Sequence, residues 1–317
     1  MELSNTRGQS TGPSNSLVQM MRRYPLLCYF LIAFGLTWAY ELIVFGVLHA
    51  PFGLNLWVLL LTLVGPTLAA FLMTAVTQGR AGILQLLRRY VLWRVGIPWY
   101  LLVLLGVPAL VLIPFLILPG ALSAFHLPGL SFWPTYLILY LTELVFGGPL
   151  GEEPGWRGFA LPRLQQRSGP LVGTLLLGVL WGLGHLPLFL LIPGYDGAGT
   201  GFVGILGPFF MFVINTIALA IIFTWVFNNT RGSLLLAILL HASINTAGGV
   251  ILLKLFPSLH MTLLFGLSLY SVFVVVALLI IAATRGRLSY QRYQRETALP
   301  APGTDRGQEP GTAGTSV

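Results

Sequence analysis

The stretch Gly151-Glu152-Glu153-Pro154-Gly155-Trp156-Arg157 places two adjacent carboxylates near the end of a long apolar run. Only nine Asp and Glu residues occur among the 317 of the chain, so two neighbours in such surroundings need an explanation. A charge at membrane depth costs several kcal/mol unless it is paired, and by default it is a functional-site hypothesis. We therefore treat this pair as the feature toward which the other polar groups of the chain are arranged.

The composition indicates a polytopic membrane protein. Hydrophobic residues make up 56% of the chain and charged residues only 8%, whereas a soluble domain has roughly 25% charged residues. The formal net charge of +8 does not predict nucleic-acid binding, because the cations lie in the segments between apolar runs, where they report topology. The single cysteine, Cys28, excludes an internal disulfide.

Several apolar runs have the length of about 20 residues that a helix needs to cross a bilayer. They predict an all-α membrane protein with eight transmembrane helices, at about 25–48, 54–77, 97–118, 133–157, 171–192, 202–227, 233–253 and 262–283. Residues 25–283 would form the membrane domain, with its motif core at about 133–250. The polar segments 1–24 and 284–317 have the composition of disordered cytoplasmic tails.

The cations predict the orientation of these helices. If eight spans alternate, every Lys and Arg except Lys254 lies on one side of the membrane, and the positive-inside rule then places both termini in the cytoplasm. The segment 80–94, between the second and third spans, has apolar and arginine-bearing faces at helical spacing. It predicts an amphipathic helix on the inner leaflet, and an ordinary cytoplasmic connector helix is the alternative.

The two acids have different surroundings on a helix. Glu153 and Arg157 are four residues apart and can form an ion pair, whereas Glu152 projects about 100° away and is free for another role. Pro154 predicts a bend, because it removes a backbone donor and crowds the preceding turn. A simpler alternative is that both acids lie at the headgroup interface.

Two further polar pairs lie inside apolar runs, Trp181 with His185 and His241 with Asn245, each spaced to share a helix face. The indole of Trp181 can orient and shield the imidazole. A lone intramembrane His is often a packing residue. Polar groups on three spans, however, have few hydrogen-bond partners in the membrane other than one another. We counted the depths of Glu152, His185 and His241 from the cytoplasmic ends of their spans at 1.5 Å per residue. The three depths agree if the fourth span continues to about Leu164. A site formed by these residues would then open toward the cytoplasmic half.

The available chemistry is hydrolysis, with an amide as the expected bond. Glu152 would act as general base toward water, and an Asn or His donor would stabilise an oxyanion. The same residue types could instead hold a divalent metal such as zinc, with His185, His241 and Glu152 as candidate ligands and a metal-bound water as nucleophile. Both alternatives remain open at this point.

The three motifs resemble those of the CAAX-protease and bacteriocin-processing (CPBP, or Abi) family of intramembrane metalloproteases. The family's Glu-Glu-x-x-x-Arg, aromatic-x-x-x-His and His-x-x-x-Asn motifs occur here in order, with Trp181 where the family usually has Phe. The sequence around them is similar to the bacterial branch. The resemblance is specific over roughly residues 80–250 and covers the outer spans only in hydropathy.

The resemblance implies a glutamate-dependent endopeptidase in the bacterial inner membrane. Its substrate would be a membrane-associated peptide or protein, CAAX-like, lipid-anchored or otherwise hydrophobic. The implied roles are activation of water by Glu152 with His185, shaping of the site by Glu153 and Arg157, and an oxyanion hole formed by His241 and Asn245. The alternative from another class is a proton-coupled transporter that uses the buried Glu and His groups as a relay, and the lack of a visible internal repeat argues against it.

Overall fold

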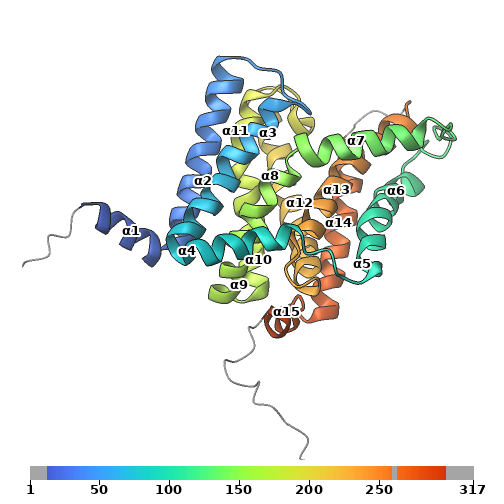
Figure 1. The fold of residues 1–317 in the computed structure, drawn as a ribbon. Coiled ribbons are helices and arrows are strands. Elements are labelled where there is room, and N and C mark those ends of the chain that lie inside the picture. The colour runs from blue at the N-terminus through green and yellow to red at the C-terminus, as the bar shows by residue number, and fades with distance from the viewer. Residues whose placement is uncertain (1–12, 259–262, 298–317) are drawn as a thin grey trace, which may run out of the picture.

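The computed structural model describes residues 13–258 and 263–297, and every regular element in these ranges is a helix (Figure 1). The all-α prediction is therefore confirmed for the described residues. Six helical runs are long and apolar enough to cross a bilayer, at Pro25–Val47, Leu56–Tyr90, Ile97–Leu116, Pro170–Leu191, Gly201–Asn229 and Gly266–Thr284, and a shorter apolar helix lies at Leu234–Gly249. The chain is thus a multi-pass integral membrane protein, and the number of eight spans stays a prediction.

The N-terminal half consists of α1 (Pro13–Arg23), α2 (Pro25–Glu41) with the π-helix η1 (Leu42–Val47), α3 (Leu56–Thr62) with η2 (Leu63–Thr67), α4 (Leu68–Tyr90), α5 (Ile97–Leu101) with η3 (Leu102–Gly106), α6 (Val107–Ile117) and α7 (Phe132–Phe146). The C-terminal half consists of α8 (Pro149–Glu153), the π-helix η4 (Pro154–Ala160), α9 (Leu161–Ser168), α10 (Pro170–Gly184), α11 (Leu186–Leu191), the 3₁₀ turn η5 (Tyr195–Gly197), α12 (Gly201–Asn229), α13 (Leu234–Leu255), α14 (Leu263–Thr284) and α15 (Tyr290–Thr297).

The expected span at 133–157 is not one helix, which corrects the prediction. Helix α7 ends at Phe146 and lies across the bundle in Figure 1, and a new helical run begins at Pro149. Between them Gly148 has a φ of 112°, a conformation open to glycine and strained for residues with a Cβ. The new run continues as η4 and α9 to Ser168, so the predicted extension past Arg157 to about Leu164 is confirmed.

Pro154 marks the start of the π-helical turn of η4 rather than a sharp kink. Its nitrogen carries no hydrogen and cannot donate the α-helical bond to residue 150. A wider π-helical turn accommodates the missing bond, and such turns recur at functional sites.

The segment after Gly79 leaves the direction of the second span. Gly79 has a φ of 62° and interrupts α4, and the rest of α4 runs across the lower end of the bundle (Figure 1). The helix predicted near 80–94 therefore exists over residues 80–90, while its position on the inner leaflet stays a prediction. The structure also has helices within both predicted tails, α1 and α15, and residues 1–12 and 298–317 of those tails lie outside the described residues.

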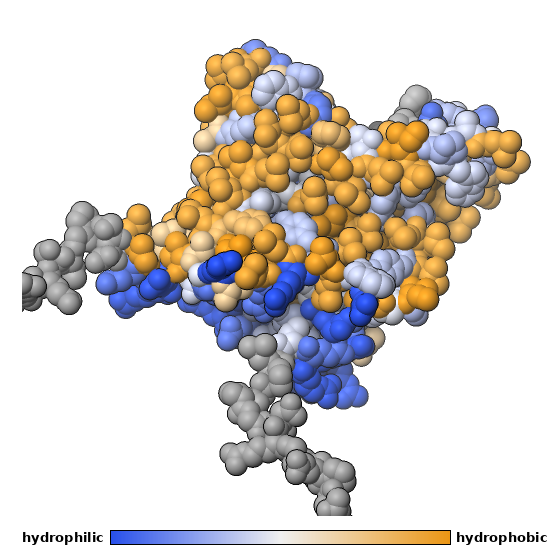
Figure 2. Space-filling view, viewed as in Figure 1, coloured by the Kyte–Doolittle hydropathy of each residue, from blue (hydrophilic) through white to orange (hydrophobic). Residues whose placement is uncertain are grey.

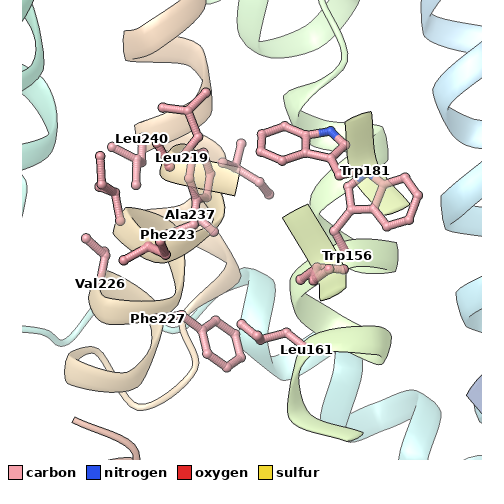
Figure 3. Close-up of a cluster of buried hydrophobic side chains, with 14 of the residues drawn as sticks. Trp156, Leu161, Trp181, Leu219, Phe223, Val226, Phe227, Ala237 and Leu240 are labelled. Carbon is pink, nitrogen blue, oxygen red and sulfur yellow. The ribbon is translucent and has the colours of Figure 1, made fainter. Parts of the chain in front are cut away.

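The exposed and buried residues are distributed as expected for a protein that lies in a bilayer. Large apolar side chains such as Leu31, Ile97 and Leu278 are exposed, and apolar residues form a broad band above a hydrophilic lower end (Figure 2). Helices η4 to α13 pack their aromatic and aliphatic side chains into a core that includes Trp156, Trp181 and Phe223 (Figure 3). This core holds the helices that carry the three motifs against one another.

Candidate active site

Glu153 and Arg157 form a fully buried ion pair, which confirms the pairing predicted from their spacing. Arg157 Nη1 lies 2.8 Å from Glu153 Oε1, and both side chains are inaccessible to solvent. The same carboxylate oxygen lies 2.8 Å from Nδ1 of His241 on α13. Because a carboxylate paired with arginine only accepts hydrogen bonds, Nδ1 of His241 carries a hydrogen, and Glu153 fixes the orientation of its ring.

The guanidinium of Arg157 lies over two neighbouring aromatic rings. Its Cζ atom is 4.2 Å from the ring centre of Trp181 and 3.9 Å from that of Phe223. Its Nε and Nη2 atoms have no hydrogen-bond partner among the described residues. Cation–π attraction to both rings supplies part of the stabilisation that these buried groups lack.

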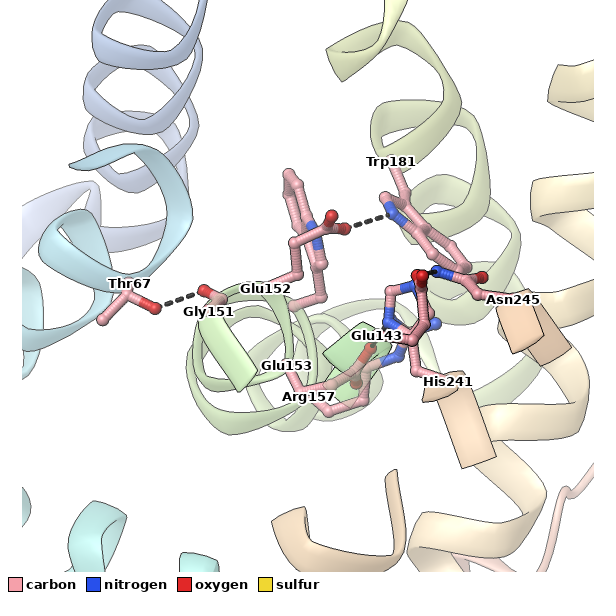
Figure 4. Close-up of polar contacts among 10 residues, drawn as sticks. Thr67, Glu143, Gly151, Glu152, Glu153, Arg157, Trp181, His241 and Asn245 are labelled. Atoms are coloured by element: carbon pink, nitrogen blue, oxygen red, sulfur yellow. Dashed lines mark hydrogen bonds and ion pairs between the residues drawn. The ribbon is translucent and has the colours of Figure 1, made fainter. Parts of the chain in front are cut away.

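Glu152 points away from this ion pair, as the helical geometry predicted (Figure 4). Its Oε2 atom accepts hydrogen bonds from the indole Nε1 of Trp181 at 2.9 Å and of Trp156 at 3.2 Å. Both indoles bind the same oxygen, and the Glu152 side chain lines a cavity. The carboxylate is therefore held in one orientation while it remains accessible from the cavity.

His185 lies at a break between α10 and α11 rather than within a continuous helix. Its amide bonds to the carbonyl of Gly182, and its Nδ1 lies 2.9 Å from the carbonyl oxygen of Trp181. A carbonyl only accepts, so Nδ1 of His185 carries a hydrogen and Nε2 is the free nitrogen of the neutral ring. The backbone carbonyl of Trp181, and not its indole as the sequence predicted, orients this imidazole.

Asn245 is held by an acid that the motif analysis did not include. Its Nδ2 atom donates to Glu143 Oε1 at 2.7 Å, from α13 to the end of α7. A Cβ added at Gly147 would lie 2.1 Å from the same Oε1, so the glycine leaves room for the carboxylate. The one signal in the sequence was the presence of an acid within an apolar run.

A cavity of about 180 Å³ brings together Glu152, His185, His241 and Asn245. Its lining extends to Phe52 and Tyr195, which lie in the connections at the end of the bundle opposite the arginine-rich segments (Figure 1). The sequence predicted an opening toward the cytoplasmic, arginine-bearing half. The lining residues correct this prediction and indicate access from the other end.

The candidate zinc ligands do not form a metal site as they stand. Within the described part of the chain, no three His, Cys, Asp or Glu side chains converge in the manner of metal ligands. One oxygen of Glu152 is already bound by two indole donors. His185, His241 and Glu152 therefore do not fit a bound zinc ion in this arrangement.

The part of the chain that carries the three motifs is similar to known proteins. Residues 132–247 match the family described as type II CAAX prenyl endopeptidase Rce1-like. A stretch of 146 residues is 32% identical to CAAX prenyl protease 2 of Methanococcus maripaludis, covering 45% of this chain and 53% of that relative. The chain thus aligns with about half the length of this relative, and the aligned family region contains all three motifs.

Proposed function

We propose that this protein is an intramembrane endopeptidase, because residues 132–247 match the family described as type II CAAX prenyl endopeptidase Rce1-like. Its substrate would be a membrane-associated protein or peptide, of the prenylated class in the relative's name or otherwise lipid-anchored or hydrophobic. The observation that carries the proposal is the placement of Glu152. Its carboxylate is bound by two indole donors at the wall of a cavity that His185, His241 and Asn245 also line.

In the proposed reaction, Glu152 takes a proton from a water molecule as that water attacks the scissile carbonyl carbon. The free Nε2 of His185 orients this water or shares in the proton transfer. When the tetrahedral intermediate collapses, Glu152 returns the proton to the leaving nitrogen, and a carboxylic acid and an amine are released, which exchange a proton to become a carboxylate and an ammonium group. Two indole hydrogen bonds on one carboxylate oxygen support this role, because they keep Glu152 oriented for transfer at the other oxygen.

Asn245 and His241 are the proposed donors to the oxyanion. Asn245 uses one hydrogen of its Nδ2 for Glu143, and its second hydrogen can stabilise the developing charge. His241 has Nδ1–H directed to Glu153, so its Nε2 donates only in the imidazolium form. In that form the Glu153 carboxylate faces both a guanidinium and an imidazolium.

For the membrane arrangement we propose eight crossings with both termini in the cytoplasm of a bacterial inner membrane. The fourth crossing would be the helical run from Pro149 to Ser168, in place of the 133–157 span, and the segment 80–90 would lie on the inner leaflet. The transporter alternative is not favoured, because the matched family is hydrolytic.

The test is cleavage of a farnesylated CAAX reporter peptide by the purified full-length protein in liposomes. We expect Glu152→Gln and His185→Ala to lose cleavage, because each removes a group that handles the proton, while thermal unfolding stays near that of the wild type. Glu296→Gln, which breaks only the exposed Arg292 ion pair, is the matched control. Cleavage by Glu152→Gln at the wild-type rate would refute the mechanism.

If the wild type leaves the reporter intact, comparing the peptides of membranes with and without the gene identifies the substrate. Elemental analysis of the purified wild type beside His241→Ala tests the zinc candidate separately. We expect equal, substoichiometric zinc in both proteins.

A further inference from the structure

A second cavity, of about 210 Å³, lies at the arginine-rich end of the bundle, between α4 and the helical run of η4 and α9. Its lining is polar and contains two guanidinium groups and no carboxylate, with contributions from Thr74, Gln78, Gln85, Arg89, Arg163 and Gln166. This cavity shares no residue with the candidate active site. The proposed peptidase reaction gives it no role.

The two arginines are fixed by neighbouring backbone carbonyls. Arg89 Nη1 donates to the carbonyl of Gly158 at 3.2 Å, and Arg163 Nη1 donates to that of Phe159 at 2.9 Å. Arg89 Nη2 also bonds to the hydroxyl of Tyr293 on α15 at 3.1 Å. These bonds engage a minority of the five N–H donors that each guanidinium carries.

The two positively charged groups line the same cavity. Among the described residues, neither arginine forms an ion pair, since the three ion pairs found there involve Arg157, His241 and Arg292. Like charges held together in a partly buried cavity are unfavourable without an anion between them. Planar guanidinium groups match phosphate oxygens in pairs of parallel hydrogen bonds.

Location and size agree with a phosphate-sized ligand. The cavity is lined by residues of α4, η4 and α9, and hydrophilic residues gather at the lower end of the molecule (Figure 2), where the positive-inside rule places the cytoplasmic headgroups. Its volume is below the roughly 300–1,000 Å³ of sites that enclose a drug-sized molecule. It therefore suits a headgroup rather than a whole organic ligand.

We propose that the Arg89–Arg163 cavity is a binding site for a phosphate group. The headgroup of an anionic phospholipid and inorganic phosphate share this chemistry, and the experiment separates them. The ligand would contact the carbonyl-bound arginines directly below the helical turn that carries Arg157. The proposal is independent of the proposed peptidase function.

The test measures binding to the full-length protein in detergent, by native mass spectrometry and by thermal shift. The probes are dioleoylphosphatidylglycerol, dioleoylphosphatidylcholine and inorganic phosphate. We expect the wild type to bind phosphatidylglycerol over phosphatidylcholine, and Arg89→Gln/Arg163→Gln to bind it at least tenfold more weakly, because charge-assisted hydrogen bonds are lost. Arg88→Gln/Arg167→Gln removes the same charge from two exposed neighbours outside the cavity and should retain binding.

The outcomes distinguish a phospholipid headgroup from inorganic phosphate as the ligand. Stabilisation by inorganic phosphate alone, lost in Arg89→Gln/Arg163→Gln, would assign the site to soluble phosphate. Equal phosphatidylglycerol binding by the two double variants, together with no response to phosphate, would overturn the proposal. If Arg89→Gln/Arg163→Gln does not fold, Gln166→Glu adds a repelling charge at the exposed rim and is compared with Gln291→Glu on α15. Binding by Gln166→Glu equal to that of Gln291→Glu would then overturn the proposal.

Discussion

Trp181 contacts three members of the candidate site at once. Its indole N–H donates to Glu152, its face lies against the guanidinium of Arg157, and its ring stands edge-on to His241 with centroids 5.6 Å apart. The phenylalanine usual at this motif position could supply the two ring contacts and not the hydrogen bond. In this chain the aromatic motif residue therefore helps to orient the carboxylate as well as to shield the cations.

We predict that Trp181→Phe lowers kcat roughly tenfold, because loss of one hydrogen bond to a charged group is worth about 1.5–3 kcal/mol and Glu152 loses part of its fixed orientation. KM should change little. Reporter cleavage under saturating substrate measures this change. Trp99→Phe, at a ring that packs on Trp225 away from the cavity, is the control, and equal kcat for the two variants would contradict the prediction.

Glu143 should act through Asn245 as a positioning residue. An exchange variant, Glu143→Gln/Asn245→Asp, can restore the hydrogen bond between α7 and α13, but it places a carboxylate where the oxyanion would form. We expect the thermal stability of the exchange variant to be close to that of the wild type and its kcat to fall at least a hundredfold. Recovery of both stability and kcat would mean that the pair is only structural.

These residue contacts differ in how far the sequence could predict them. The Glu153–Arg157 pair is local to one helical turn, so its spacing was sufficient. The bonds from Trp181 to Glu152 and from Asn245 to Glu143 join different helices. Their existence depends on how α8, α10 and α13 pack, which a spacing rule does not contain.

At the scale of elements, the helical run from Pro149 to Ser168 positions both glutamates. Hydropathy alone merged its first half with α7, because the two segments are similarly apolar. The local signal was Gly147-Gly148-Pro149, a pair of glycines followed by a residue favoured at the first position of a helix. Thr67 also donates its hydroxyl hydrogen to the carbonyl of Gly151 (Figure 4), which ties the new helix start to the second span.

Gly155 is the point of closest approach of η4 to its neighbours. A Cβ there would lie 2.4 Å from the Tyr29 hydroxyl and 2.8 Å from the carbonyl oxygen of Pro66. We predict that Gly155→Ala destabilises the protein by about 1–3 kcal/mol through overpacking, measured by thermal unfolding in detergent. Gly35→Ala, in α2 with no atom within 4 Å of the added Cβ, should be neutral or stabilising, and equal effects at the two sites would refute this packing account.

At the scale of the whole molecule, the sequence predicted which end carries the cations but not which end the site faces. The predicted fourth span began at about residue 133, and its continuation to about Leu164 placed Glu152 at a depth similar to that of the two histidines. In the structure that helix starts only at Pro149, so Glu152 lies in its first turn, far from the arginine-rich end at Ser168. Where a helix begins depends on tertiary packing, and a hydropathy run does not reveal it.

Membrane topology then decides from which side a substrate would reach the cavity lined by Glu152. If the arginine-rich segments lie in the cytoplasm, as we propose, the loops near Phe52 and Tyr195 face outward. The single cysteine, Cys28, is buried, so a Cys28→Ala background permits labelling at chosen exposed positions. We predict that a membrane-impermeant maleimide labels Leu54→Cys and Thr200→Cys in intact cells, whereas Arg88→Cys and Arg167→Cys react only after permeabilisation.

The opposite labelling pattern would place the cavity mouth in the cytoplasm and the arginines outside, against the positive-inside rule. The predicted pattern requires the scissile bond to enter from the outer leaflet or from the space beyond it.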